Sequence, residues 1–194
     1  MAFANFHSHE IHCKIVYFGA PGSGKTTNLR SILAQTTEDV VNGKLTLSPP
    51  DPLHKPLFEF LPVSIGQFQK HHVKVHLYAL PDDKLLPTLL PVILKGIDGM
   101  IFVVDSAIES LHLNLRAWQY AQRILGEEGI FISDLPAVMQ YNKQDLSNAM
   151  PRALLRRCLN SLNLPDQEAA AVSGDGVLEC LHIVVEQFVR EFSS

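Results

Sequence analysis

The chain lacks the sequence features of a secreted, membrane-spanning or nucleic-acid-binding protein. Its first residues, MAFANFHSHE, contain neither the basic nor the apolar segment of a signal peptide, and the second residue is not the glycine that N-myristoylation requires. No stretch approaches the roughly 20 apolar residues that a membrane-spanning helix needs. Lysine and arginine number 16 against 20 aspartates and glutamates, so phosphate backbones are not generally attracted. We therefore expect a cytoplasmic protein with no membrane insertion and no nucleic acid partner.

Cysteine is also scarce. Cys13, Cys158 and Cys180 are odd in number, widely spaced and without a CxxC pair, which favours reduced thiols over a disulfide framework. No internal repeat or low-complexity tract divides the chain. With 194 residues, of which 46% are hydrophobic, the chain is long and apolar enough for one folded domain, which we expect to span residues 1–194.

Strand and helix patterns alternate along the chain. Short β-branched or aromatic runs predict strands over residues 13–18, 57–63, 73–78, 100–105, 137–141 and 169–172. Apolar residues spaced three and four apart predict helices over residues 26–34, 84–94, 111–125, 151–159 and 176–192. The segment joining the second and third strands is too short for a crossover helix, so this pair should be an antiparallel hairpin. The layout predicts a three-layer α/β fold of the Ras-like type, with a six-stranded, mostly parallel sheet and one antiparallel edge hairpin.

A complete phosphate-binding motif follows the first predicted strand. The sequence GAPGSGKT matches GxxxxGK[ST] in the strand-to-helix setting that this motif requires. Glycines let the backbone curl so that its N–H groups face inward, and the start of the helix adds a positive dipole end. Lys25 can then reach the β- and γ-phosphates, and the Thr26 hydroxyl can hold Mg²⁺. The nucleotide-binding residues predicted here are Gly19, Gly22, Ser23, Gly24, Lys25, Thr26 and Thr27.

A second motif indicates which base is bound. Asn142, Lys143 and Asp145 form an NKxD pattern after the strand predicted at 137–141, at the binding edge of the sheet. The Asp145 carboxylate only accepts hydrogen bonds, and guanine offers two adjacent donors that adenine lacks. The alternative for an isolated NKxD is a polar turn that ends a strand. Further on, the sequence AAAVSG at 169–174 carries little information alone, because alanines in a buried strand explain it equally well.

Several stretches resemble the MglA family, the bacterial small Ras-like GTPases that set cell polarity and drive motility. They are HCKIVYFGAPGSGKTTNL, FLPVSIGQ, HLYALP, LKGIDGMIFVVDS, QYNKQDL and the C-terminal GDGV. The resemblance implies a GTP/GDP switch that uses Mg²⁺, with Lys25 and Thr26 assisting transfer of the γ-phosphoryl group to water. It implies that Ala170 and Ala171 lie in the loop whose backbone contacts guanine O6. The partners it implies are an MglB-like roadblock protein, which activates hydrolysis, and RomR-like polarity regulators at a cell pole.

The segments that sense the γ-phosphate depart from this family. Where family members carry an arginine finger and a Mg²⁺-binding threonine, this chain has Lys55 and Pro56. Proline offers neither a side-chain oxygen nor an N–H, and lysine lacks the planar fork of arginine. Where the family has Pro-Gly-Gln, this chain has Pro81, Asp82 and Asp83, whose carboxylates would repel a γ-phosphate. We therefore expect weak or partner-dependent GTP hydrolysis, or alternatively a pseudo-GTPase scaffold whose partner binding is insensitive to GTP versus GDP.

A P-loop kinase of small molecules is a third hypothesis. Asp105 ends an apolar strand as a Walker B acid would, and under this hypothesis it would bind Mg²⁺. No arginine-rich lid is evident, and Asp145 argues against adenine. Under the Ras-like hypothesis, Asp105 is a structural residue of the fourth strand.

Two other groups of side chains carry weaker signals. The group His7, His9, His12 and Cys13 matches no zinc-ligand spacing, and strand alternation would send His12 and Cys13 to opposite faces. The other group, Arg152, Arg156 and Arg157, forms a basic helix face that favours a solvated surface over a docking patch.

Overall fold

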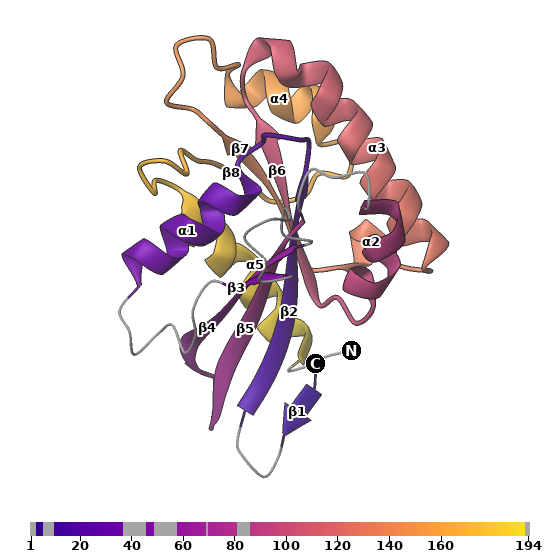
Figure 1. The fold of residues 1–194 in the computed structure, drawn as a ribbon, viewed down its shortest axis with the longest axis vertical. Helices are drawn as coiled ribbons and strands as arrows, with labels where there is room; N and C mark the ends of the chain where they lie inside the picture. The colour runs from indigo at the N-terminus through magenta and orange to yellow at the C-terminus, as the bar shows by residue number, and fades with distance from the viewer. Residues whose placement is uncertain are drawn as a thin grey trace.

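The computed structural model describes residues 3–5, 10–36, 46–48, 58–68, 70–80 and 86–192 (Figure 1). The strands are β1 (Phe3–Asn5), β2 (Glu10–Gly19), β3 (Thr46–Ser48), β4 (Phe58–Phe68), β5 (His71–Ala79), β6 (Gly99–Asp105), β7 (Ala137–Asn142) and β8 (Asp166–Glu168). The α-helices are α1 (Lys25–Gln35), α2 (Leu86–Leu94), α3 (Leu111–Glu127), α4 (Arg152–Leu159) and α5 (Val177–Phe192). Short 3₁₀ turns, η1 (Ile108–Ser110) and η2 (Ile132–Asp134), precede α3 and β7.

In the described part of the chain, the strands form one eight-stranded sheet in the order β3-β4-β5-β2-β6-β7-β8, with β1 paired to β2. The strands from β5 to β8 pair in parallel, and β4 pairs antiparallel with β5 as a hairpin. The predicted Ras-like α/β fold and its antiparallel hairpin are therefore confirmed. Two three-residue strands, β1 and β3, extend the predicted set of six. The last strand was predicted three residues too late, because 169–172 follows β8 as a loop.

Helices cover the sheet on both faces, and each face has its own apolar core (Figure 1). On one face, α1 and α5 pack over β2, β4, β5 and β6. On the other, α2, α3 and α4 pack over β6, β7 and the end of β2. Both cores are built from side chains that alternate along the strands, as a sheet buried on two sides requires. Among the described residues, no helix is long and apolar enough to cross a membrane.

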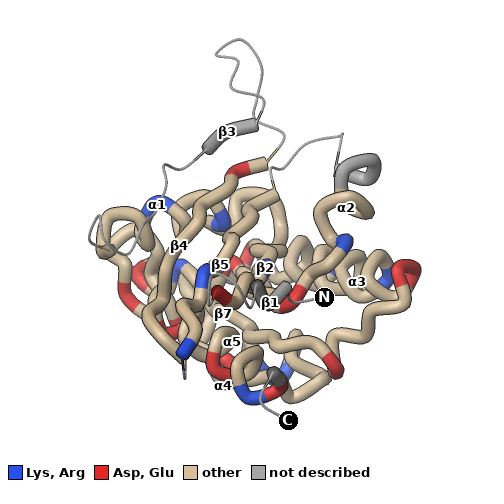
Figure 2. Tube along the Cα trace, turned by 90° about the horizontal axis from the view of Figure 1, so that it is seen from below, with Lys and Arg blue, Asp and Glu red and all other residues tan. Residues whose placement is uncertain are grey.

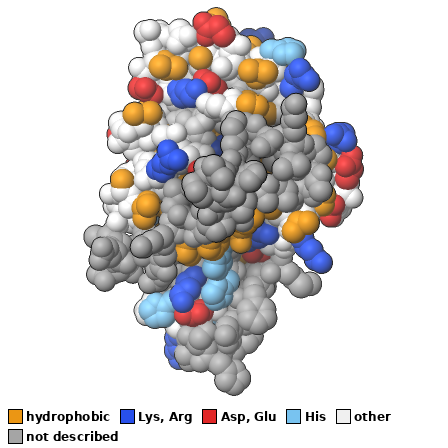
Figure 3. All heavy atoms as spheres, in the orientation of Figure 1, with side chains coloured by type: hydrophobic (Ala, Val, Ile, Leu, Met, Phe, Trp, Pro, Cys, Tyr) orange, Lys and Arg blue, Asp and Glu red, His pale blue; other side chains and the backbone are white. Residues whose placement is uncertain are grey.

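Among the described residues, the helices cover the sheet face opposite α5 only in part. Burial alternates along the first half of β2 and along β5, whereas it is continuous from Ile15 to Phe18, where α3 packs. Side chains on the half over which no described helix packs, such as His12 and His76, are half-buried. Figure 3 shows histidines gathered with lysine and an acidic side chain on the lower part of this face. Figure 2 shows that Lys and Arg are interspersed with Asp and Glu along the described trace.

Candidate nucleotide-binding site

The P-loop joins the end of β2 to the start of α1, as the motif predicts. Gly19, Gly22 and Gly24 all have positive φ angles, of 150°, 71° and 102°. At two of them a side chain has no room. A Cβ on Gly19 would lie 2.2 Å from the Val103 carbonyl oxygen, and one on Gly24 would lie 2.3 Å from Nδ2 of Asn142. The loop therefore closes against the neighbouring strands only because these positions carry no side chain.

Lys25 places its charge inside this loop. The residue is 6% exposed, and Nζ donates to the carbonyl oxygens of Gly19 (3.1 Å) and Ala20 (3.0 Å). Thr26 and Thr27 follow in the first turn of α1, where both are half-buried. The first N–H groups of a helix have no partner within the helix, so this end attracts anions. A buried ammonium beside a helix start is an arrangement suited to phosphate groups.

Asn142 ties two loops together. It ends β7 and is 1% exposed. Its Nδ2 donates to the Ser23 carbonyl of the P-loop (2.8 Å), and its Oδ1 accepts the Ala171 N–H (2.9 Å). Both ends of the amide are thus used, because the two loops follow β2 and β8 at the same edge of the sheet, on either side of β6 and β7. The side chain connects a phosphate-binding segment to the segment predicted to hold the base.

Lys143 and Asp145 serve different purposes in the same motif. Lys143 has a φ of 65°, and its Nζ lies 2.7 Å from Oδ2 of Asp105. The other oxygen of Asp105 accepts the Ala107 N–H at 3.0 Å, so both oxygens of this carboxylate have partners within the fold. Asp145 is exposed and has no partner among the described residues. Its carboxylate is therefore available to a ligand.

The loop after β8 differs from expectation in which backbone N–H group is free. Ala170 and Ala171 were expected to present a backbone N–H to the base, but both groups are already used. The Ala170 N–H donates to the Asp175 carbonyl (2.9 Å), and the Ala171 N–H donates to Asn142. The next N–H belongs to Val172, which is 84% exposed and has no partner in the described part of the chain. The N–H group available to a base is therefore that of Val172, one residue after the predicted pair. The sequence alone did not reveal this.

Comparisons with known proteins agree with this geometry. Residues 1–188 match the family model of the ADP-ribosylation factor family. The chain is 38% identical over 191 residues to the mutual gliding-motility protein MglA of Myxococcus xanthus (strain DK1622), over 98% of this chain and 97% of that protein. The chain belongs to the MglA-like small GTPases. The resemblance inferred from its motifs is confirmed, and guanine-nucleotide binding follows from the family.

In this MglA-like GTPase, two buried polar residues that were not predicted support the site. Asn28 of α1 donates from Nδ2 to the Gly24 carbonyl (2.9 Å) and accepts at Oδ1 from Nε2 of Gln140 (2.8 Å). Both side chains are fully buried, so this pair links the P-loop to β7 through the interior. A polar residue on the buried face of a predicted helix was the available signal, but its partner lies 112 residues away.

The arginines of α4 are partly solvated, as predicted, but two of them also have a partner that was not predicted. Arg152 and Arg156, whose side chains are 38% and 56% exposed, both bind the carboxylate of Asp166, whose side chain is completely buried. Arg157 remains exposed and has no partner among the described residues. The i,i+4 spacing of the first two arginines was a visible signal, since such residues share one helix face. Nothing local pointed to Asp166 in the next strand.

The predicted γ-phosphate-sensing residues and the histidine–cysteine group do not form part of the described site. Lys55, Pro56, Pro81, Asp82 and Asp83 lie outside the described residues, as do His7 and His9. Cys13 is buried in the core, whereas His12 lies on the opposite face of β2, as alternation predicts. Among the residues that the structure describes, no three His, Cys, Asp or Glu side chains are grouped as metal ligands.

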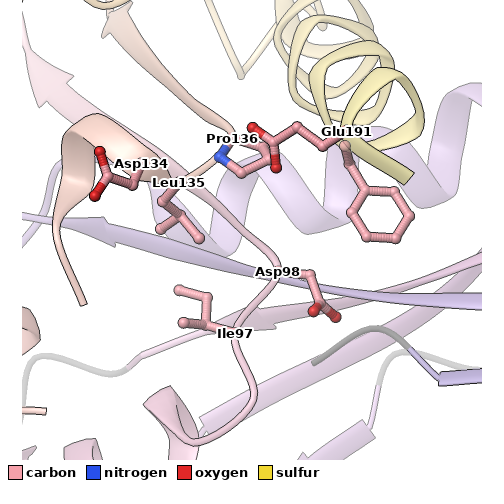
Figure 4. A pocket seen from close by; sticks show the side chains of 7 residues that line it. Ile97, Asp98, Asp134, Leu135, Pro136 and Glu191 are labelled. Carbon is pink, nitrogen blue, oxygen red and sulfur yellow. The ribbon is translucent and has the colours of Figure 1, made fainter. Parts of the chain in front are cut away.

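A pocket of about 310 Å³ lies at the other edge of the sheet, where β6 and β7 begin (Figure 4). Its lining residues are Ile97, Asp98, Asp134, Leu135, Pro136, Phe188 and Glu191. Another, of about 400 Å³, lies between the β4-β5 hairpin and α5. Both are separated from the P-loop by the length of the strands, so neither is part of the nucleotide site.

Proposed function

We propose that this MglA-like GTPase is a guanine-nucleotide switch that acts in bacterial cell polarity and motility through partner proteins. The observation that supports it most is the side chain of Asn142, which joins the P-loop to the loop after β8. Phosphate and base would then be held by one rigid unit, with the free carboxylate of Asp145 beside it. The motility context comes from the MglA relative.

The phosphate end would be bound by the P-loop and the first turn of α1. Gly22, Ser23 and Gly24 supply a curled backbone, and the N–H groups of Lys25, Thr26 and Thr27 begin the helix. The Lys25 ammonium, now on the Gly19 and Ala20 carbonyls, would reach the β- and γ-phosphates. The Thr26 hydroxyl would hold Mg²⁺, which when bound neutralises charge on the phosphates as the γ-phosphoryl group passes to water.

The base end would be bound by Asp145 and Val172. The Asp145 carboxylate accepts from the N1–H and the exocyclic amine of guanine, which adenine cannot offer together. The free N–H of Val172 would donate to guanine O6, since the N–H groups of Ala170 and Ala171 are engaged. Lys143 is held against Asp105 and would present its aliphatic chain beside the base.

Hydrolysis would be slow in this protein. Lys55 stands where the family has its arginine finger, and loss of such an arginine lowers the rate by about 10³–10⁵-fold. Pro56, Asp82 and Asp83 remove the expected contacts to the γ-phosphate. A nucleotide shifts the equilibrium between two conformations of the protein only as far as its affinities for those conformations differ. GTP and GDP would therefore bind with similar affinity.

Guanine selectivity is tested with Asp145→Asn. The substitution replaces one acceptor oxygen by a donor, which suits xanthine because xanthine has a carbonyl at that edge. Competition binding should show that the variant prefers XDP to GDP, whereas the wild type prefers GDP. Asp134→Asn, an exposed aspartate at the other edge of the sheet, is the matched control and should behave as wild type. Unchanged preference in Asp145→Asn would contradict the assignment.

Switching is tested by single-turnover GTP hydrolysis with and without an MglB-like roadblock protein, and by binding of that protein or a RomR-like regulator. We expect slow turnover and partner binding that depends little on the nucleotide. The variant Lys55→Arg, Pro56→Thr, Asp82→Gly, Asp83→Gln should hydrolyse faster and bind partners preferentially with a GTP analogue. If the variant gains no activity, the pseudo-GTPase scaffold becomes the better assignment. Brisk stimulated turnover by the wild type would overturn the slow-switch proposal.

A further inference from the structure

Strand β8 is the shortest of the strands that lead into the site. It has three residues, lies at the end of the sheet and pairs with β7 alone in the described part of the chain. Its last residue, Glu168, is followed directly by Ala169 and the loop that contains Val172. A short edge strand has one open side, and something other than strand pairing must hold that side.

Asp166, the first residue of β8, is bound by Arg152 and Arg156 of α4. Its side chain has an exposed fraction of 0%, although it carries a carboxylate. Arg152 donates from Nε to Oδ1 (2.7 Å) and from Nη2 to the backbone carbonyl of Asp166 (2.7 Å). Arg156 donates from Nη2 to Oδ1 (2.6 Å) and from Nε to Oδ2. We call this group of three residues the Asp166 clamp; it holds β8 against α4.

Two neutral side chains complete the surroundings of the carboxylate. The Tyr141 hydroxyl and Nδ2 of Asn160 each lie 3.4 Å from Oδ2. Burial would raise the pKa of the Asp166 carboxyl, but hydrogen bonds from Arg156 and Arg152 outweigh it and hold the pKa below its ordinary value. The carboxylate is therefore charged at neutral pH, where the ion pairs are present.

The clamp is connected to both segments that would hold the base. Three residues after Asp166, the Ala169 N–H donates to the Tyr141 carbonyl (2.8 Å), and the Ala169 carbonyl accepts the Gln144 N–H (3.1 Å). Gln144 lies inside the NKxD motif, immediately before Asp145. A shift of β8 would therefore move Ala169, and with it the position of Asp145 relative to Val172.

We propose that Asp166 is a positioning residue for guanine binding, which acts through β8 and never touches the nucleotide. This inference rests on the proposed binding of guanine between Asp145 and Val172. The clamp fixes the base-binding end of the site, whereas the P-loop is held by Asn28 and its own glycines and is joined to the base-binding loop through Asn142 of β7. Loosening the clamp should therefore weaken contacts to the base and leave contacts to the phosphates intact.

The test uses Asp166→Asn, which keeps the shape but replaces one oxygen by an amide that donates toward guanidinium donors. The arginine side chains are 38% and 56% exposed, so they can turn to water and the fold survives. The dissociation rate of a fluorescent GDP should rise about tenfold, because the buried ion pairs are lost. Binding of inorganic pyrophosphate, a probe for the phosphate end alone, should stay within about twofold of wild type.

Three further variants separate positioning from general stability. Arg157→Ala, on the same helix but outside the clamp, should release GDP as wild type does. Leu125→Ala lowers the melting temperature through a cavity at the far end of α3 and should leave the ratio of GDP to pyrophosphate affinity unchanged. Arg156→Lys keeps the positive charge but lacks the planar guanidinium, so its rate of GDP release should lie between those of wild type and Asp166→Asn. This variant replaces Asp166→Asn in the test if Asp166→Asn fails to fold.

Normal GDP release from folded Asp166→Asn, or equal losses for GDP and pyrophosphate, would overturn the positioning role of Asp166. Wild-type protein that binds pyrophosphate but no guanine nucleotide would overturn the proposed function, and this inference with it.

Discussion

Gly19 and Gly24 show how closely the P-loop is packed at the level of single residues. Each combines a positive φ with a neighbour that a Cβ would strike. At Gly24 that neighbour is Nδ2 of Asn142, the atom that binds the Ser23 carbonyl. A methyl group there would affect backbone strain and a buried hydrogen bond at the same time.

Gly24→Ala should therefore lower the free energy of unfolding by about 2–4 kcal/mol, from backbone strain plus a lost buried hydrogen bond. Urea unfolding measures this value. The matched control is Gly126→Ala in α3, where a Cβ meets nothing within 4 Å. That substitution should stabilise the protein by about 0.5–1 kcal/mol, because alanine favours helix over glycine. Equal effects of the two substitutions would contradict the tight packing inferred for the loop.

Lys25→Ala should weaken GDP binding by about 100-fold or more, since charge-assisted bonds to phosphate are strong and this is the buried cation of the loop. Equilibrium binding of fluorescent GDP measures the loss. Lys95→Ala, an exposed lysine after α2, changes the net charge equally and should bind GDP as wild type does. A P-loop that kept its affinity without Lys25 would not be the phosphate site.

At the level of elements, the partly covered face of β2, β5 and β4 carries a column of rings. His12 and His76 stack at 5.2 Å, with Nδ1 of His12 only 2.8 Å from Nε2 of His76. Phe60 stacks on the other side of His76 at 5.7 Å. Two protonated imidazoles could not keep this contact, because both nitrogens would then be donors. The hydrogen bond between His12 and His76 therefore requires that at least one of the two imidazoles is neutral.

His76 should make stability depend on pH. Burial, then His12 and Lys74, lower the pKa of His76 below its ordinary value of 6.5. Between the lowered pKa and 6.5, the unfolded chain binds the proton and the folded chain does not, so stability is full above pH 6.5 and declines as pH falls through this window.

Urea unfolding between pH 5 and 8 measures that decline as a difference between wild type and His76→Gln. The variant should lose part of the pH dependence, whereas His112→Gln, an exposed histidine of α3, should keep it. Identical pH profiles for wild type and His76→Gln would contradict the assignment to His76. Glu10, Lys74 and Lys14 also face this region, so their charges must be retained in the comparison.

At the scale of the whole molecule, nucleotide binding should stabilise the fold. The site draws on β2, α1, β7 and the loop after β8, so unfolding any of these elements releases the ligand. At 100 times its dissociation constant, GDP should add about 2.7 kcal/mol, which for a protein of this size raises the melting temperature by about 5–10 °C. Thermal unfolding with GDP and with ADP measures this. ADP should have little effect, and an equal shift with both would contradict guanine selectivity.

Much of the fold could be predicted because its buried elements have strong local patterns. The run that became β6, Gly99–Asp105, is apolar at nearly every position and was predicted to within one residue. Strand β8 has the polar sequence Asp-Gln-Glu, which does not resemble a buried strand. The apolar alanines that follow it therefore predict the strand three residues too late. The short strands β1 and β3 were missed because three residues carry no period of their own; they form by pairing with β2 and β4.

The sequence by itself determined the site's chemistry: a glycine-rich turn before Lys25 and Thr26, and an acceptor at Asp145 after a buried strand. These signals are local, since each motif needs only its own spacing and the element beside it. Only the tertiary structure decided that the free N–H belongs to Val172, that Asn142 holds two loops and that Arg152 and Arg156 enclose Asp166. Those facts depend on which hydrogen-bonding groups already have partners. Asn142 lies 119 residues from Ser23 and 29 residues from Ala171, and the parallel strands bring these residues together at their carboxyl ends. Asp166 lies only 14 and 10 residues from Arg152 and Arg156, and it meets them because α4 packs beside β8.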